Sequence, residues 1–371
     1  MSRLGTSDTA ICTIVARNYL PYARVLCASF LQHNPDGRCF VLIIDELEKE
    51  AETNKTFESV TLDHLSINNA SAFCFKYDVT ELSTALKPHL LDFLIKKRGV
   101  ERLLYLDPDI LVTGSLSELF RQLSDHDVII TPHLDTDFPD SIYLPNLRSM
   151  LLTGAFNLGF LGIRRSEIAA NFLHWFKAKT EEFCLLAPGE GLFVDQKLFD
   201  VAITLFPEIF IERDTGYNVG PWNIHSRQLR KEGDTWLCNE GPLHFYHFSH
   251  YDPDRPGEIA SYFTRYSLSE RLDLKAIYDL YSRLLRSEGY NRGKLAKYGH
   301  GSFNNGDPIT NDIRKHYRML PSRASISDPF ACAELRRLNR LFLARARAKR
   351  FLLPIARPAK RLMRRVHLWG N

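Results

Sequence analysis

The chain has 371 residues, and its hydrophobic content of 44% is ample for the packed core of a globular protein. Its seven cysteines are odd in number, irregularly spaced and without a CxxC pair, which argues against a disulfide framework and a zinc site. No apolar run approaches the roughly 18 residues of a membrane span and no secretory leader is evident, so we expect a cytoplasmic protein.

Short apolar strands alternate with amphipathic helices from the start of the chain. In chain order, the pattern predicts strands over residues 10–16, 39–46, 102–106, 127–132, 157–163 and 209–213. It predicts helices over residues 20–32, 79–97, 115–123, 166–183 and 268–286, and another that begins near Phe193. This alternation indicates an α/β sandwich with a mostly parallel sheet, in which ligands gather at the carboxyl ends of the strands.

Two carboxylates, Asp107 and Asp109, lie within the strongly apolar run RLLYLDPDILV. Carboxylates one residue apart at a strand end repel each other unless a cation or a ring of donors lies between them. Mg²⁺ and Mn²⁺ take oxygen ligands and commonly bridge protein carboxylates to substrate phosphates, so this pair is a candidate metal site. The alternative is a solvated strand end in which Asp107 caps a turn.

Three histidines, His244, His247 and His250, are spaced by three in the segment HFYHFSH. One of them, placed on a turn, could complete the ligand shell of the same ion, and an imidazole beside two carboxylates suits Mn²⁺ better than Ca²⁺. For each histidine taken alone, the alternative is a partly buried structural role.

The order of these segments resembles a known family. The motifs are ICTIVARNY, a lysine in a helix at position 87, LLYLDPDILV, AFNLGFLGI, VDQKLFD and HFSH. Their order resembles retaining glycosyltransferases of the GT-A fold, and in particular family 8, the group of glycogenin and the bacterial lipopolysaccharide hexosyltransferases. The segments YNVGPWNI and HFSHYDPDRP are similar to a bacterial branch that acts in surface-polysaccharide synthesis. The likeness covers about residues 10–265.

The resemblance implies an α/β/α sandwich of the GT-A type and transfer of a hexose from a nucleotide-diphosphate sugar, expected to be a UDP-sugar. The acceptor would be a saccharide or a lipid-linked saccharide. A Mn²⁺ or Mg²⁺ ion on the diphosphate would be held by Asp107, Asp109 and His247, with Asp107 shared between the ion and the ribose. The other donor contacts implied by the resemblance come from Ala16, Asn18, Tyr19, Lys87 and Asn157.

Asp195 and Gln196 would lie near the anomeric carbon and are the expected catalytic residues. We also expect Trp222 and Asn223 to line the acceptor groove, because aromatic faces commonly cover sugar rings. The alternatives are structural: Asn157 could satisfy backbone groups, Asp195 could start a helix, and Trp222 could belong to the core.

The sequence departs from the family pattern at two positions. Arg17 stands where many relatives have an acid, and His250 stands where a glycine usually follows the histidine ligand. No carboxylate is placed as a nucleophile, so we expect front-face attack with retention, in which the leaving phosphate takes the acceptor proton. Lys87 and the ion would stabilise the departing diphosphate.

Two other classes of function fit part of the pattern. LDPDILVTG resembles the DxDx[TV] motif of haloacid-dehalogenase-type phosphatases, although that motif normally lies on the first strand. The second class is a protein that binds a sugar nucleotide or a glycan without turning it over. The intact acidic, histidine and glutamine positions argue against this class.

The charge of the chain is uneven. Residues 330–371 hold 12 Lys and Arg against one acidic residue, while the rest of the chain is mildly acidic. Basic residues mixed with Leu, Phe and Trp369 are typical of a helix on anionic lipid, so we expect the tail to bind the inner face of the cell membrane. A solvated tail is the alternative, and the acidic body disfavours nucleic acid as a partner. We therefore expect a catalytic region over 1–265, a helical extension over 266–325 and a basic amphipathic tail over 326–371.

Overall fold

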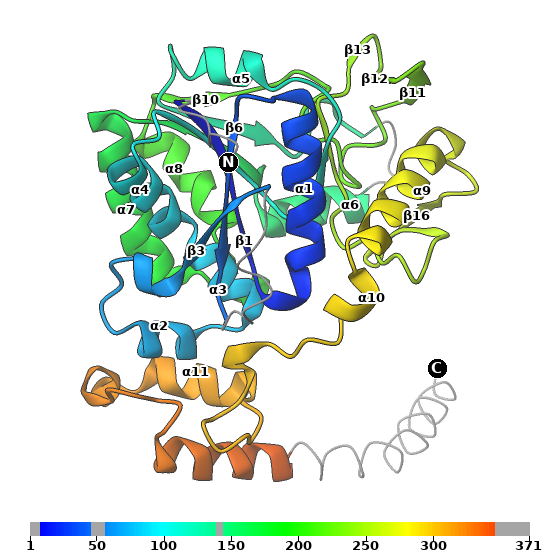
Figure 1. Ribbon diagram of the computed structural model, residues 1–371. Helices are drawn as coiled ribbons and strands as arrows, with labels where there is room; N and C mark the ends of the chain where they lie inside the picture. Colours follow the sequence, from blue (N-terminus) through cyan, green and yellow to red (C-terminus); the bar gives the residue numbers. More distant parts are fainter. Residues whose placement is uncertain (1–7, 46–55, 139–143, 346–371) are drawn as a thin grey trace, which may run out of the picture. The chain divides into compact units, whose positions relative to one another are not determined.

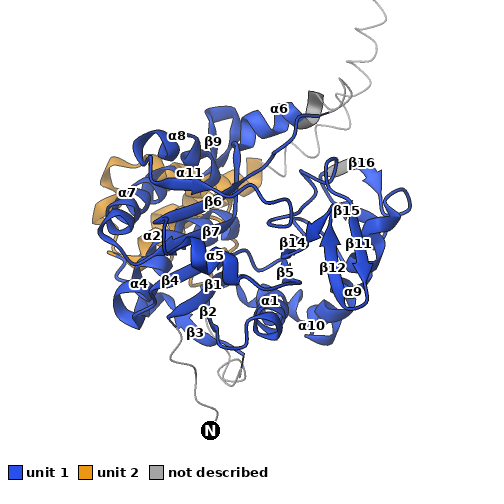
Figure 2. Cartoon of the chain, turned by 90° about the horizontal axis from the view of Figure 1, so that it is seen from above, with its two compact units in different colours: residues 1–67, 79–299 blue, residues 68–78, 300–371 orange. Residues whose placement is uncertain are grey.

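The computed structural model describes residues 8–45, 56–138 and 144–345. The chain divides into two compact units, one of residues 1–67 and 79–299 and one of residues 68–78 and 300–371 (Figure 2). The functional regions expected from the sequence divide at 265 and 325 instead, and they stay predictions. Most of the predicted basic tail, residues 346–371, lies outside the described residues.

The first unit is built on a central sheet. Among the described residues, seven strands form it in the order β10-β6-β7-β4-β1-β2-β3. Their bounds are β1 (Thr9–Val15), β2 (Arg38–Ile43), β3 (Glu58–Thr61), β4 (Arg102–Leu106), β6 (Val128–Pro132), β7 (Phe156–Arg164) and β10 (Ile209–Ile211). Only β7 runs antiparallel to its neighbours, β4 and β6, so the predicted mostly parallel sheet is confirmed.

Helices cover both faces of this sheet. In Figure 1, α1 lies on one face, while α4 and α7 lie together on the other. The helices of the first unit are α1 (Leu20–His33), α3 (Val79–Ala85), α4 (Lys87–Arg98), α5 (Ser117–Gln122), α6 (Leu144–Thr153), α7 (Glu167–Phe183), α8 (Phe199–Leu205), α9 (Leu272–Ser287) and α10 (Tyr290–Gly293). The central strands are buried on both faces, as expected for strands made of near-continuous apolar runs.

Short strands outside the sheet complete the unit. They are β5 (Ile110–Val112), β8 (Leu186–Ala187), β9 (Leu192–Phe193), β11 (Leu229–Glu232), β12 (Thr235–Cys238), β13 (Gly241–Pro242), β14 (Phe245–His247), β15 (Glu258–Ala260) and β16 (Phe263–Ser267). The antiparallel pair of β5 and β14 is the one that bears on the site, because it joins segments more than 130 residues apart in sequence.

Two predicted helices differ from the structure. The helix expected over 79–97 is two helices, α3 and α4, that meet at Leu86. Pro88 lies in the first turn of α4 and has no N–H, so it cannot extend the hydrogen-bond ladder of α3 and suits a helix start instead. The helix expected near Phe193 begins only at Phe199, because Val194 has a positive φ of 41° that no helix accepts. The strand β3 and the helix α2 were not predicted.

The second unit joins α2 (Ala70–Lys76) to the segment that contains α11 (Asn311–Met319). Its centre is Phe75, whose ring packs edge-on against Tyr317 and Phe330 at 5.1 Å. Arg314 is buried and donates hydrogen bonds to the carbonyls of Cys74 and Phe75, at 3.2 and 2.8 Å. These bonds satisfy carbonyls at the carboxyl end of α2, which has no further helical turn to pair with them.

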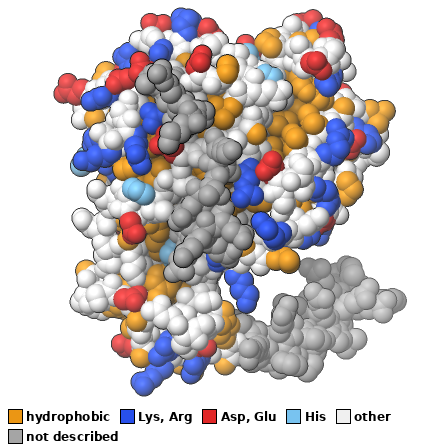
Figure 3. Space-filling view, viewed as in Figure 1, with side chains coloured by type: hydrophobic (Ala, Val, Ile, Leu, Met, Phe, Trp, Pro, Cys, Tyr) orange, Lys and Arg blue, Asp and Glu red, His pale blue; other side chains and the backbone are white. Residues whose placement is uncertain are grey.

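The surface of the described residues is of mixed charge. On the face shown in Figure 3, acidic and basic side chains lie interspersed over the first unit. Within the described ranges, no helix is long and apolar enough to cross a membrane.

Candidate functional site

The turn between β4 and β5 carries the two carboxylates. The amide of Asp107 donates to the carbonyl of Gly159 on β7 at 2.8 Å, and the amide of Ile110 donates to the carbonyl of Asp107 at 3.2 Å. The Tyr105 hydroxyl donates to Oδ1 of Asp107 at 2.8 Å. These bonds fix Asp107 and Asp109 at the carboxyl end of β4, where strand topology places ligands in sheets of this kind.

The strand β14 brings His247 to this turn. It pairs antiparallel with β5 and places His247 opposite Ile110. Neighbouring side chains on a strand point to opposite faces. Tyr246 and Phe248 both pack against aromatic rings of α9, so His247 between them is turned towards the carboxylates.

The three side chains form a compact cluster. His247 Nε2 lies 3.0 Å from Oδ1 of Asp109 and 3.8 Å from Oδ2 of Asp107. One ligand atom from each residue lies within 4.8 Å of the others, and the described ranges hold no second such group of His, Cys, Asp and Glu side chains. Two carboxylates and an imidazole are a donor set that suits Mn²⁺ or Mg²⁺. The residues present therefore fit the metal that the resemblance implies.

The charges of the cluster are strongly coupled. Burial raises the pKa of Asp107 above its ordinary value, although Lys87 and His247 oppose this. Burial would also raise the pKa of Asp109, but the charge and hydrogen bond of His247 outweigh it and lower that pKa. Burial lowers the pKa of His247, yet Asp109 and Asp107 prevail and raise it. The two carboxylates thus favour the charged form of His247, which would take the place of a metal ion's positive charge.

A second ion pair lies beside the cluster. Lys87, at the start of α4, is 1% exposed, and its Nζ lies 2.6 Å from Oδ2 of Asp195. The same Nζ donates to the carbonyl of Leu158 at 2.7 Å and lies 4.3 Å from the ring centre of Tyr105. Since Tyr105 also bonds Asp107, Lys87 connects the predicted catalytic carboxylate to the acidic pair.

The backbone before Asp195 is strained. Val194 has a φ of 41°, which is rare for a β-branched residue, and such outliers concentrate at functional sites. The next residue, Gln196, is buried, and its Nε2 donates to the carbonyl of Thr153 at 2.9 Å. The strain therefore falls directly before the two residues that the resemblance makes catalytic.

The segment after β1 lies near the acidic pair. The amide of Arg17 donates to Oδ1 of Asp45 at 2.8 Å, which anchors the turn that contains Ala16, Asn18 and Tyr19. Tyr19 is 41% exposed and stacks on Tyr22 at 4.4 Å. Desolvation around its hydroxyl, and after it the charge of Asp109, raises the pKa of Tyr19 to about 12. An exposed ring held this way offers a flat face beside the candidate metal site; its role towards a nucleoside stays a prediction.

The remaining predicted residues are buried. Asn157 is 7% exposed and Asn223 is 2% exposed. Asn223 accepts a hydrogen bond from the amide of Gly220 at 3.0 Å. Trp222 is 5% exposed and packs edge-on against His247, with ring centres 5.1 Å apart. The acceptor roles of Trp222 and Asn223 stay predictions. In the structure, Trp222 supports the ring of His247, and Asn223 bonds the backbone of Gly220.

The other two histidines of HFYHFSH are separated from the cluster or exposed. His244 stacks on Tyr217 at 4.2 Å, and its Nδ1 lies 2.9 Å from the carbonyl of Ser115. His250 is exposed and has a φ of 56°, in the left-handed region that favours glycine. A histidine therefore adopts, at the position where the resemblance implies a glycine, a conformation that glycine takes readily, and its ring stands edge-on to Tyr262 at 5.3 Å.

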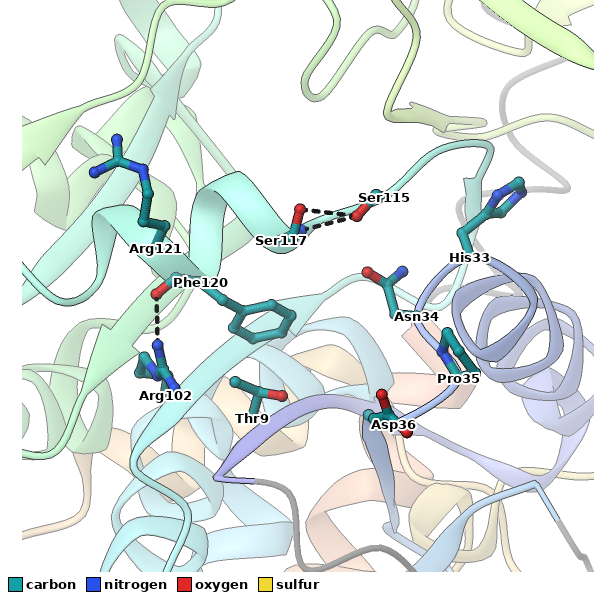
Figure 4. Close-up of a pocket in the computed structure, with 11 residues that line it drawn as sticks. Thr9, His33, Asn34, Pro35, Asp36, Arg102, Ser115, Ser117, Phe120 and Arg121 are labelled. Carbon is teal, nitrogen blue, oxygen red and sulfur yellow. Dashed lines mark hydrogen bonds between the residues drawn. The ribbon is translucent and has the colours of Figure 1, made fainter.

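A cavity of about 370 Å³ lies at a different edge of the sheet (Figure 4). Thr9 and Arg102, the first residues of β1 and β4, line it, whereas the acidic turn follows the last residue of β4. The other lining residues are His33, Asn34, Pro35, Asp36, Gly37, Ser115, Ser117, Phe120 and Arg121. None of them is a predicted site residue.

Comparisons with known proteins find two bacterial relatives and a group of structural neighbours. No family model matches the chain. YfnF of Bacillus subtilis (strain 168), whose function is uncharacterized, is 27% identical over 293 residues, covering 75% of this chain and 91% of YfnF. YfnD of the same strain, also uncharacterized, is 24% identical over 243 residues, covering 64% and 76%.

Two solved structures illustrate the structural likeness. The galactosyltransferase LgtC, in complex with donor and acceptor sugar analogues, has a TM-score of 0.47 and 16% identity, covering 77% of this chain and 100% of LgtC. The glycosyltransferase GlyE of Streptococcus pneumoniae TIGR4 has a TM-score of 0.44 and 14% identity, covering 80% of this chain and 66% of GlyE.

Sequence reasoning missed several residues that shape the site. Asn218 and His133 are buried beside Asn157 and His247, but a lone polar residue in an apolar segment gives no sign of its distant partner. Tyr105 also escaped notice, since an aromatic residue in a strand reads as core. Gly159 on β7 allows a close approach of the imidazole: an added Cβ would lie 2.2 Å from Cε1 of His247.

We predict that Gly159→Ala displaces His247, because the new methyl group would overlap the imidazole. Overpacking of this kind costs about 1–3 kcal/mol of stability, and a displaced ligand should weaken Mn²⁺ binding about 10-fold or more. Thermal unfolding and Mn²⁺ titration measure the two effects. The control is Gly189→Ala, where an added Cβ meets nothing within 4 Å. Equal Mn²⁺ affinity in both variants would contradict the packing argument.

Proposed function

We propose that this chain is a metal-dependent retaining glycosyltransferase that moves a hexose from a nucleotide-diphosphate sugar, with UDP as the expected nucleotide, to a saccharide or lipid-linked saccharide acceptor. One observation carries the proposal: the cluster of Asp107, Asp109 and His247 adjoins the buried pair of Lys87 and Asp195 at the carboxyl end of β4. A divalent cation site beside a buried lysine is what a departing diphosphate requires.

Different residues would stabilise the departing diphosphate and the cationic sugar ring. When the bond between the anomeric carbon and the phosphate oxygen breaks, its electron pair goes to the diphosphate and positive charge builds on the sugar ring. Asp107 and Asp109 would hold the Mn²⁺ or Mg²⁺ that neutralises the diphosphate. Lys87 adds a positive charge from a side chain that is already desolvated, so it needs no reorganisation during the reaction.

The sugar side of the reaction falls to Asp195 and Gln196. Asp195 is ion-paired with Lys87, and its carboxylate would stabilise the cationic ring while Gln196 lies next to it in the same turn. Among the residues that the structure describes, we identify no carboxylate placed as a nucleophile. The acceptor hydroxyl therefore attacks from the face that the phosphate leaves, and its proton passes to the leaving phosphate oxygen, which retains the anomeric configuration.

We predict that Asp109→Asn abolishes metal-dependent nucleotide release. The substitution removes a carboxylate that would ligate the metal and that pairs with His247, so turnover should fall at least about 100-fold. The measurement is nucleotide release from a panel of sugar nucleotides, with and without Mn²⁺, on protein whose folding is checked by circular dichroism. The control, Asp125→Asn, removes an exposed carboxylate paired only with Arg121 at 3.5 Å.

Each result of that assay is informative. Release of inorganic phosphate instead of nucleotide would show a phosphatase. Thermal stabilisation by a sugar nucleotide without any release would show a binding protein. Wild-type turnover in Asp109→Asn would refute the metal role.

We further propose that the basic tail, 326–371, docks on anionic lipid at the inner face of the membrane, because a lipid-linked acceptor would be met there. Its sequence mixes 12 basic residues over 330–371 with large apolar ones. Flotation with vesicles rich in anionic lipid should recover the full chain and lose a chain cut after residue 345. Equal recovery of both would contradict the proposal.

A further inference from the structure

A chain of buried hydrogen bonds leads from His247 to a backbone carbonyl. His247 Nδ1 lies 3.2 Å from Oδ1 of Asn218, and Nδ2 of Asn218 lies 3.1 Å from Oδ1 of Asn157. Nδ2 of Asn157 lies 3.3 Å from Nε2 of His133, whose Nδ1 lies 2.7 Å from the carbonyl of Gly154. All four side chains are 7% exposed or less.

At the His133 end of this series of hydrogen bonds, the chemistry of the partners fixes which atom donates. The carbonyl of Gly154 can only accept, so Nδ1 of His133 carries the proton and Nε2 of the neutral ring is an acceptor. Burial lowers the pKa of His133 to about 4, which keeps the ring neutral. The amide of Gly159 can only donate, and it donates to Oδ1 of Asn157 at 3.0 Å. The amide nitrogen of Asn157 must therefore face His133.

The same logic carries through to His247. Oδ1 of Asn157 can only accept, so Asn218 must turn its Nδ2 towards it; Nδ2 also donates to Oγ1 of Thr131 at 2.8 Å. Oδ1 of Asn218 then faces His247 and can only accept, so Nδ1 of His247 carries a proton. The other ring nitrogen, Nε2, lies 3.0 Å from Oδ1 of Asp109 and is the nitrogen left to ligate a metal ion.

We propose that Asn218 is a positioning residue that holds a proton on Nδ1 of His247 and so leaves Nε2, the nitrogen that faces Asp107 and Asp109, as the ligand atom for a metal ion; Asn157 and His133 fix Asn218 in turn. The inference rests on the proposed function, because Nε2 has to give up its proton only if it ligates a metal. A residue that accepts a hydrogen bond from a metal-ligating histidine commonly contributes 10- to 100-fold in metal affinity. Here the carbonyl of Gly154 and the amide of Gly159 fix the direction of every hydrogen bond in the series.

The first test is the tautomer itself. In the full chain labelled with ¹⁵N-histidine, the nitrogen shifts of His247 should report a protonated Nδ1 both without metal and with Mg²⁺, and Mg²⁺ should remove a proton from Nε2 alone. The signal is assigned by its loss in His247→Gln. A bare Nδ1 in the wild type, with or without Mg²⁺, would overturn the inference, whatever the protein catalyses.

The second test is Mn²⁺ affinity in Asn218 variants. Asn218→Leu removes the acceptor and should weaken Mn²⁺ binding about 10- to 100-fold. Asn218→Asp keeps an acceptor for the Nδ1 proton but loses the donor to Asn157, so it should lose less affinity than Asn218→Leu. The control is Asn339→Leu, which loses a similarly buried asparagine that bonds Thr310 and Pro308 in the other unit.

The outcomes separate the two proposals. Wild-type affinity in Asn218→Leu, or equal losses in the Leu and Asp variants, would contradict a tautomer-fixing role. If the wild type binds no Mn²⁺, the proposed function fails, while the nitrogen shifts still decide whether Asn218 fixes the ring. If Asn218→Leu does not fold, the wild-type spectrum and Asn218→Asp remain decisive.

Discussion

The repulsion between two partly buried carboxylates is the constraint on which the rest of the site depends. Asp107 and Asp109 are held in one turn by backbone hydrogen bonds, so they cannot separate to relieve their like charges. Without a metal, positive charge has to come from His247, 3.0 Å from Asp109, and from Lys87, whose charge opposes the rise in the pKa of Asp107. The fold therefore brings two cations from distant parts of the chain to one short turn.

Much of the first unit serves this convergence. The pairing of β14 with β5 delivers His247, and the aromatic packing of α9 fixes which way its side chain points. β7 supplies Gly159, where no side chain could fit beside the imidazole. Behind the ring, Asn218 and its partners determine which nitrogen faces the carboxylates. Each of these elements restrains one part of the site, and together they bring three ligand atoms within 4.8 Å of one another.

Sequence patterns were sufficient for the parts that depend on local chemistry. Apolar runs and their alternation with helices predicted the α/β sheet, and the apolar context of Asp107 and Asp109 predicted a charged site at a strand end. His247 was chosen among three histidines through the family resemblance, and strand alternation explains physically why it faces inwards. Lys87 was placed through the resemblance as well, but its contact with Asp195 needed the structure.

The rest depends on contacts that sequence does not encode locally. Asn218 lies in the segment YNVGPWNI, from which Trp222 and Asn223 were predicted to belong to the site. Its hydrogen-bond partner Asn157 is 61 residues away in the sequence, and His133 is 24 residues away from Asn157. Likewise, nothing in residues 68–78 signals that they belong to the unit of residues 300–371. Pro88 signals the start of a new helix after Leu86, but the apolar residues on both sides of it led to the prediction of one helix.

The most direct measurement of the central claim is anomalous diffraction from crystals soaked with Mn²⁺ and a nucleoside diphosphate. The account predicts an anomalous peak within coordinating distance of Asp107, Asp109 and Nε2 of His247, with diphosphate oxygens completing the shell on the side of Lys87. A diphosphate bound elsewhere, or bound at this turn with no manganese between it and the carboxylates, would contradict it.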